Sequence, residues 1–282
     1  MKTILLFGAS GAVGRFLKPL LTPKYRVIGV SRKPVDGPDS LQGDLSRTDF
    51  VWPQADIAVS AGPLDAFAYW LERNPQIPLQ RIVALSSMSA ESKQFSVNER
   101  ERAVAQRLRD SEAKLFAIGT ARHIAVTIFR PTMIYGAGID RSLALIARKV
   151  KRQHWIPFVP GMTGLRQPVH AADLAGACAS VLENAATFGK TYELGGGERL
   201  TLKEMTRRIR KCHASWSIPV WMPRSVLKIG ARYAGFGDVV DGMIARLKVS
   251  LVADNFAAER DFAYAPRQFI VGDVLPVTKT QP

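Results

Sequence analysis

Short apolar runs alternate with longer helical patterns along the first half of the chain. The runs cover residues 4–7, 25–30, 57–59, 81–85 and 124–129, and small or polar residues follow most of them. Continuous apolar runs of this length are typical of strands buried on both faces, as in a parallel sheet covered by helices. The pattern predicts an α/β fold of the Rossmann type, a doubly wound parallel sheet that binds ligands beyond the carboxyl ends of its strands.

The first apolar run leads directly into a glycine-rich turn, TILLFGASGAVG, with the spacing G-x-x-G-x-x-G. Glycines at this point allow a sharp turn, a close approach of the backbone to a pyrophosphate, and tight packing of the next helix, whose positive end faces the phosphates. A glycine triplet alone also fits an ordinary turn. The strands on both sides, at the length of a β-α-β unit, favour a dinucleotide site. The expected cofactor contacts here are Gly8, Ser10, Gly11, Ala12, Val13 and Gly14.

The second strand ends in Ser31-Arg32-Lys33, where a cofactor with a free ribose 2′-hydroxyl would require an acidic residue. Arginine and lysine can neutralise a 2′-phosphate, whereas a carboxylate would repel it. We therefore expect all three residues to contact the cofactor and NADP(H) to be favoured over NAD(H). The alternative is a solvated basic turn, which is common in so basic a protein.

The few cysteines and histidines limit the kinds of disulfide and metal site that the chain can form. Cys178 and Cys212 are the only two cysteines among 282 residues, lie far apart and form no CxxC pair. This pattern favours a reduced, cytoplasmic protein without a cysteine metal site. With four histidines and no carboxylate-histidine cluster, we expect no metal. No segment supplies the roughly 20 apolar residues of a membrane span, and the apolar run that starts at the N-terminus is too short for a secretory signal.

The net charge of +15 could indicate nucleic acid, an anionic membrane surface or an anionic small substrate as the partner. The cations gather in residues 148–152 and 199–211, at a spacing typical of solvated helix faces. No nucleic-acid-binding motif is present. We expect an anionic small-molecule substrate, no membrane and no nucleic acid, and a monomer or homodimer.

Several segments, in order, resemble the extended short-chain dehydrogenase/reductases, also called the NAD-dependent epimerase/dehydratase family. They are TILLFGASGAVG, Gly43-Asp44-Leu45, Ser60-Ala61-Gly62, Ala84-Leu85-Ser86-Ser87 and FRPTMIYG at residues 129–136. The last is similar to the family's RPxxxYG segment beside the nicotinamide, and the fourth to the strand that carries the active-site hydroxyl. The resemblance implies cofactor contacts from Asp44, Leu45, Ser60, Ala61, Gly62, Arg130 and Pro131.

Later segments extend the resemblance to residues 166–175 and 191–197. An arginine at the position of Arg166 reaches the substrate diphosphate in sugar-nucleotide members, and a guanidinium fork suits that role; the alternative is a surface loop residue. The resemblance further implies a cofactor-binding domain at 1–198, with 136–165 contributing to the substrate cleft, and a small α/β substrate lobe at 199–282. Near its middle, Trp216 and Trp221 are expected to pack between lobes.

The chain departs from the family at the Tyr-x-x-x-Lys pair. No tyrosine has a lysine four residues later, and alignment puts Asn98 and Arg102 at those positions. Arg102 could bind the nicotinamide ribose, but an amide cannot replace a phenol as an acid or base. Proton transfer would then need Ser86, Ser87, Glu99, Tyr135 or a group on the substrate, although each of these residues also has an ordinary structural role open to it.

Two functions follow. The first is an NADP(H)-dependent oxidoreductase or epimerase that acts by hydride transfer on a nucleotide-sugar-like or other anionic substrate. The second is a catalytically silent NADP(H)-binding protein that senses redox state or forms a scaffold. The RPxxxYG segment and Arg166 favour the first, and the missing tyrosine favours the second.

Overall fold

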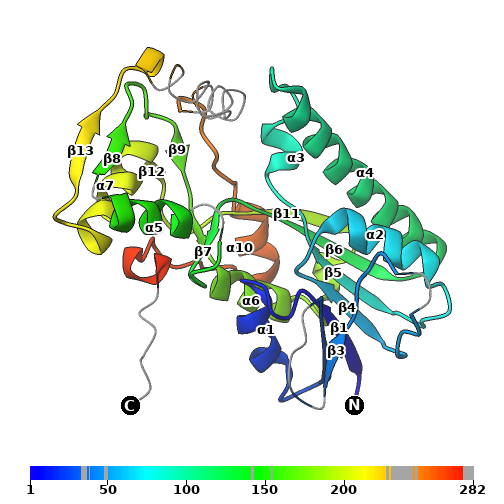
Figure 1. Cartoon of the computed structure of the whole chain (residues 1–282). Helices are drawn as coiled ribbons and strands as arrows, with labels where there is room; N and C mark the ends of the chain where they lie inside the picture. The colour runs from blue at the N-terminus through cyan, green and yellow to red at the C-terminus, as the bar shows by residue number, and fades with distance from the viewer. Residues whose placement is uncertain are drawn as a thin grey trace, which may run out of the picture. The chain divides into compact units, whose positions relative to one another are not determined.

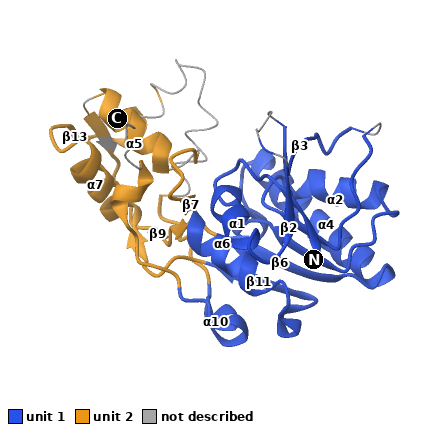
Figure 2. Cartoon of the chain, turned by 90° about the horizontal axis from the view of Figure 1, so that it is seen from below, with its two compact units in different colours: residues 1–131, 171–194, 254–265 blue, residues 132–170, 195–253, 266–282 orange. Residues whose placement is uncertain are grey.

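The computed structural model describes residues 1–32, 37, 39–47, 50–140, 143–153, 155–226, 229, 244 and 247–275. They form two compact units (Figure 2). Unit 1 comprises residues 1–131, 171–194 and 254–265, and unit 2 comprises residues 132–170, 195–253 and 266–282. The chain thus passes repeatedly between the units. The boundary at residues 198/199 was defined by function, between a cofactor-binding domain and a substrate lobe, and it stays a prediction.

A parallel sheet is the centre of unit 1 (Figure 1). Its seven strands, counted over the described residues, have the order β11-β6-β5-β4-β1-β2-β3. They are β1 (Thr3–Phe7), β2 (Arg26–Ser31), β3 (Ser40–Gln42), β4 (Ile57–Ser60), β5 (Arg81–Leu85), β6 (Ala125–Pro131) and β11 (Lys190–Leu194). The order reverses between β1 and β4, which is the switch point where ligands bind in doubly wound sheets. The Rossmann-type fold predicted from the apolar runs is confirmed.

Helices cover both faces of this sheet. The helical segments of unit 1 are α1 (Gly14–Leu21), α2 (Leu64–Arg73), α3 (Ser89–Ser92), α4 (Glu99–Ala121), α6 (Ala171–Ser180), the 3-10 helix η1 (Ala185–Thr187) and α10 (Phe256–Phe262). Helix α1 packs beside α6, and α2 beside α4. The core between the sheet and α2 is aromatic: the ring of Phe7 lies 5.3 Å from that of Phe67 and 4.5 Å from that of Trp70, centroid to centroid. Packing of these rings holds the end of β1, and hence the glycine turn, in place.

Among its described residues, unit 2 contains short strands and the amphipathic helices α5 and α7. Its elements are β7 (Ile134–Tyr135), α5 (Leu143–Gln153), β8 (Trp155–Phe158), β9 (Leu165–Arg166), β10 (Val169–His170), β12 (Leu200–Thr201), α7 (Leu202–His213), β13 (Ile218–Trp221) and the 3-10 helix η2 (Val271–Val274). Helix α7 begins at a capping threonine, because the amide of Glu204 donates to Thr201 Oγ1 at 3.1 Å. Met205 and Ile209 then face the core of the unit.

Trp216 and Trp221, which are expected to pack between lobes, are 53% and 63% exposed. Packing between lobes concerns the placement of the two units and stays a prediction.

Candidate functional site

The glycine turn between β1 and α1 has the tight geometry that its sequence predicts. Gly8 has φ +76°, a left-handed conformation, and a Cβ there would lie 2.8 Å from the carbonyl oxygen of Ala61. A Cβ on Gly14 would collide with the Gly8 carbonyl oxygen and approach Ala9 Cα to 2.7 Å. The amide of Gly11 donates to the same Gly8 oxygen at 2.8 Å. A Cβ is therefore excluded at Gly8 and Gly14, where the backbone itself forms the surface of the turn.

The carboxyl ends of β1 and β4 bring the turn beside Ser60, Ala61 and Gly62. Phe7 pairs with Ser60, and the amide of Ala61 donates to the Phe7 carbonyl at 2.9 Å. The Ser60 hydroxyl is buried and has no hydrogen-bond partner within the described structure. A buried, unsatisfied hydroxyl is unusual in a folded protein and fits a site that a ligand completes.

The end of β2 carries the residues expected at the adenosine. Ser31 is buried, and its carbonyl accepts from the amide of Gly43 at 3.0 Å. Arg32 and Asp44 are near each other: hydrogen bonds from Ser46 lower the pKa of the Asp44 carboxyl, and the charge of Arg32 lowers it further. Lys33 lies outside the described residues. Leu45 packs against the core of unit 1.

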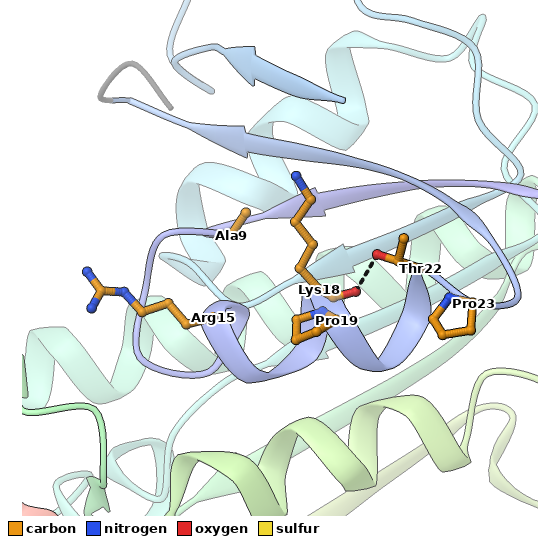
Figure 3. Close-up of a pocket in the computed structure, with 6 residues that line it drawn as sticks. All are labelled: Ala9, Arg15, Lys18, Pro19, Thr22 and Pro23. Atoms are coloured by element: carbon orange, nitrogen blue, oxygen red, sulfur yellow. Dashed lines mark hydrogen bonds between the residues drawn. The ribbon is translucent and has the colours of Figure 1, made fainter. Parts of the chain in front are cut away.

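A hollow on the surface of α1 adds two cations that the sequence analysis did not single out (Figure 3). Arg15 and Lys18 line it together with Ala9, Pro19, Thr22 and Pro23. Arg15 Nε donates to the Ser10 carbonyl at 3.0 Å, and Lys18 Nζ donates to the Asp39 carbonyl at 3.2 Å. Arg15 directly follows Gly14, and that position was the signal that could have found it.

An ion-pair network lies at the ends of β5 and β6. Arg130 Nε donates to both carboxylate oxygens of Glu112, at 3.0 and 3.1 Å, and Arg130 Nη1 lies 2.6 Å from Glu91 Oε1. Ser86 Oγ donates to the same Glu112 carboxylate. Glu112 is only 4% exposed. Hydrogen bonding to Glu112 raises the pKa of Arg130. Arg130 is therefore paired with two carboxylates, and these ion pairs connect the end of β6 to α3 and α4.

Sequence reasoning did not find Glu112. It lies four residues after Leu108 and three before Leu115, both of which contact the core of unit 1. A carboxylate on the apolar stripe of a helix needs a buried partner, so its position was a usable signal. Pro131 follows Arg130 at the end of β6, and its carbonyl accepts from the amide of Met88 at 3.0 Å.

Asn98 and Arg102 have clear structural roles at the start of α4. Asn98 Oδ1 accepts from the amides of Arg100 and Glu101, at 2.9 and 3.3 Å, which makes Asn98 the helix N-cap. Arg102 Nη1 donates to the carbonyls of Ser96 and Val97, at 2.8 and 3.1 Å. Both residues fasten the preceding loop to the helix.

The remaining residues considered for catalysis are distributed over both units. Ser87 Oγ accepts from the amide of Ser89 at 3.1 Å, at the start of α3. Tyr135 is buried in unit 2, where its hydroxyl accepts from the amide of Ile270 at 3.0 Å and its ring contacts His170 and Phe269. Ser86 and Ser87 thus follow the carboxyl end of β5 in unit 1, and Tyr135 belongs to the core of unit 2.

Arg166 is buried in unit 2. Its Nη1 donates to the carbonyls of Leu165 and Val249, at 2.8 and 2.7 Å, and its backbone pairs with Leu200 of β12. It is therefore no surface loop residue. Neighbouring Gln167 links the same strands: its Nε2 donates to the Gly196 carbonyl at 2.8 Å, and its Oε1 accepts from the Ala253 amide at 2.9 Å.

Within the described ranges, no three histidine, cysteine, aspartate or glutamate side chains gather to hold a metal ion. None of the helices resolved in those ranges combines the length and the apolar character needed to cross a bilayer.

Comparison with known proteins gives partial sequence matches. No protein-family model matches the chain. Over 151 residues it is 30% identical to the mitochondrial NADH dehydrogenase [ubiquinone] 1 alpha subcomplex subunit 9 of Arabidopsis thaliana, covering 53% of this chain and 35% of that protein. Over 144 residues it is 24% identical to the UDP-glucose 4-epimerase of Vibrio cholerae, covering 50% of this chain and 43% of that protein. The matches thus span less than half of each relative.

Solved structures match over almost the whole chain. An epimerase from Methanothermobacter thermautotrophicus has a TM-score of 0.73 at 13% identity, over 97% of this chain and 90% of that one. A UDP-glucuronic acid 4-epimerase from Bacillus cereus, solved with UDP-glucuronic acid and NAD, has a TM-score of 0.70 at 15% identity, over 97% and 96%. The resemblance to the extended short-chain dehydrogenase/reductases is confirmed at the level of the fold.

Proposed function

We propose that this chain, which has the epimerase/dehydratase-type fold of the extended short-chain dehydrogenase/reductases, binds NADP(H) in unit 1 and supports hydride transfer on an anionic, nucleotide-sugar-like substrate. The observation that carries the proposal is the glycine turn. A Cβ at Gly8 or Gly14 would strike neighbouring backbone, so this turn keeps an open backbone surface at the switch point of the sheet.

The residues of unit 1 suit a dinucleotide. The turn and the N-terminus of α1 would hold the pyrophosphate, and Ser60 and Gly62 would line the dinucleotide at the switch point. The nicotinamide, once bound, supplies or accepts a hydride. Ser86 would take a proton from a substrate hydroxyl by passing its own to Glu112, to which it already donates. Cytoplasmic location stays a prediction from the cysteine content.

The preference for NADP(H) rests on Arg32 and the neighbouring cations. We expect Arg32→Glu to weaken NADPH about 10- to 100-fold while changing NADH little, because a charge-assisted hydrogen bond is worth about 1.5–3 kcal/mol. Arg26→Glu, at the opposite end of β2, is the matched control. Calorimetric titration of both cofactors measures the effect, and equal losses for both cofactors would refute the assignment to the 2′-phosphate.

Arg166 is proposed to bind the substrate diphosphate, with residues 136–165 and 199–282 contributing to the substrate site. We expect Arg166→Ala to weaken UDP-sugar binding about 10-fold or more and to leave NADPH binding unchanged. Because Arg166 also bonds Leu165 and Val249, Arg199→Ala is the control: Arg199 donates to the Ala253 carbonyl in the same unit. A similar loss in both variants would mean that Arg166 acts only through the stability of unit 2.

The second candidate is a catalytically silent NADP(H)-binding protein. The hydrogen bonds of Asn98 and Arg102 favour this candidate. Asn98 caps α4 and Arg102 donates to the carbonyl of Ser96, so both side chains stabilise the start of α4. The partial match to a subunit of a respiratory complex in Arabidopsis thaliana supports a scaffolding role.

Calorimetric titration with NADPH and NADH, followed by UDP- and dTDP-sugars on the cofactor-loaded protein, separates the two. Tight NADPH binding followed by sugar-nucleotide binding supports the enzyme. NADPH binding with no second ligand favours the silent protein. Failure of both cofactors to bind would overturn the proposal and leave the glycine turn as an inherited feature of the fold.

A further inference from the structure

The positive charge of the protein is concentrated in unit 2. Its segments contain 19 lysines and arginines against 6 aspartates and glutamates, a net charge of +13. Unit 1 contains 20 against 18, a net charge of +2. Nearly all of the charge thus belongs to one unit, far more than is needed for a small substrate that one or two guanidinium groups can neutralise.

The same unit has an exposed apolar sheet face. The register of β8 and β13 pairs Trp155 with Ile218, and alternation along the strand puts Val220 on the same face. These side chains are 39%, 66% and 36% exposed. The opposite face of β8 carries Ile156 and Phe158, which are buried in the core of unit 2. The sheet is therefore one-sided, with its outer side apolar (β8 and β13, Figure 1).

Two further exposed tryptophans and two cations lie around β13. Trp216, before β13, and Trp221, at its end, are both more than half exposed. Trp221 pairs with Phe158, so alternation along the strand puts it on the opposite side of the sheet, and the Lys203 ammonium lies 5.2 Å from the centroid of its ring. Arg210 Nη1 donates to the carbonyl of Ser217, immediately before β13, at 2.7 Å. Exposed tryptophans and cations thus gather around this two-stranded sheet.

We propose that this β8–β13 face, made of Trp155, Ile218 and Val220 with the exposed Trp216 just before β13, docks onto the surface of an anionic lipid bilayer. Tryptophan prefers the boundary between headgroups and acyl chains, and aliphatic side chains gain by entering it. The surrounding cations attract anionic headgroups. Docking of this kind is independent of cofactor and substrate and requires no spanning helix.

Other partners fit the face less well. Isoleucine and valine side chains contribute little to binding a phosphodiester backbone, which interacts favourably with cations and hydrogen-bond donors. A second copy would bring another +13 unit against the first, and like charges repel. The sequence predicts no membrane partner, because it contains no spanning segment. It does not show that exposed tryptophans and cations lie near one another in unit 2.

The test is cosedimentation of the full chain with vesicles of phosphatidylcholine, alone or mixed equally with phosphatidylglycerol. We expect binding to the mixed vesicles only, and release in about 1 M salt, where the Debye length is about 3 Å. Brominated lipids should quench the tryptophan fluorescence. Trp52 and Trp70 are buried in unit 1, so quenching reports the three exposed tryptophans of unit 2.

Variants locate the binding surface. Trp155→Ser/Ile218→Ser/Val220→Ser should weaken vesicle binding by at least about tenfold, because three apolar side chains no longer enter the interface. The control, Val51→Ser/Phe95→Ser/Val97→Ser, removes apolar groups of unit 1 that are even more exposed and should bind as the parent does. Should the first variant fold poorly, Lys151→Glu/Arg152→Glu, two exposed cations just before β8, should also abolish binding.

Several outcomes would overturn the proposal. They are equal binding to neutral vesicles, an unchanged affinity in the triple serine variant, and the absence of quenching. Retention on duplex DNA that the triple serine variant loses would assign the face to nucleic acid instead. A dimer in sedimentation velocity that the same variant dissociates would assign it to a second copy.

Discussion

Replacing Gly14 by alanine is expected to weaken binding of both nicotinamide dinucleotides by about 100-fold or more, because displacing the turn removes charge-assisted hydrogen bonds worth about 1.5–3 kcal/mol each. The added methyl group would collide with the Gly8 carbonyl oxygen and lie 2.7 Å from Ala9 Cα. Neither contact can relax by moving a flexible side chain, since both atoms belong to the backbone of the turn. The helix start must therefore shift away from β1.

The same substitution should destabilise unit 1 by about 3 kcal/mol, the upper part of the usual range for overpacking. For a unit of this size, each kcal/mol lowers the unfolding midpoint by roughly 2–4 °C. Thermal unfolding with and without NADPH measures both effects. Parent and variant should differ in midpoint without ligand, and only the parent should gain stability when NADPH is added.

Gly62→Ala is the matched control for Gly14→Ala. Gly62 follows the carboxyl end of β4, beside the glycine turn, but a Cβ there meets no atom within 4 Å. We expect an unfolding midpoint close to that of the parent. If Gly14→Ala behaved like this control in both stability and cofactor binding, the turn would not have the steric role assigned to it.

Replacing Glu112 by alanine should lower the free energy of unfolding by about 3–5 kcal/mol, because removing one partner of a buried ion pair leaves the other charge unpaired. Arg130 would keep only Glu91 as an acidic partner, and Ser86 would lose its acceptor. Glu112→Gln retains an acceptor and should cost less. Amide hydrogen exchange in β5 and β6 measures the loss where it occurs, within unit 1.

Glu72→Ala supplies the comparison for an exposed pair. Glu72 and Lys114 lie 2.9 Å apart but are 49% and 42% exposed in their side chains, so the loss should be below about 1 kcal/mol. The double variant Glu112→Ala/Arg130→Met should recover part of the stability lost in Glu112→Ala, since no unmatched charge remains. A double variant as unstable as the sum of its single changes would contradict the account of Arg130 as a charge held by Glu112.

The two sets of variants distinguish residues that would bind the dinucleotide from residues that stabilise the strand ends around it. Changes in the glycine turn act on the surface offered to the dinucleotide, whereas changes at Glu112 act on the strand ends that carry Ser86 and Arg130. The resemblance to cofactor-binding proteins implied that Arg130 itself contacts the cofactor, and that role stays a prediction. Its ion pairs indicate a structural contribution in any case, because two carboxylates already match its charge.

The Rossmann-type sheet, the glycine turn and the basic end of β2 could all be predicted from the amino-acid sequence. These features depend on neighbours along the chain: apolar runs make buried strands, and glycine permits backbone that other residues cannot adopt. The helix start at Thr201 was likewise visible, because its partner is only three residues away.

The partners of the long side chains could not be predicted from the sequence, because they come from distant parts of the chain. Arg130 meets Glu112 and Glu91, 18 and 39 residues away, and the Tyr135 hydroxyl meets an amide 135 residues away. The tertiary structure also shows that the charge divides between two units assembled from separate segments, and that Trp216 and Trp221 stay exposed. Local backbone preferences are encoded over a few residues, whereas burial and charge pairing depend on which distant segments pack together.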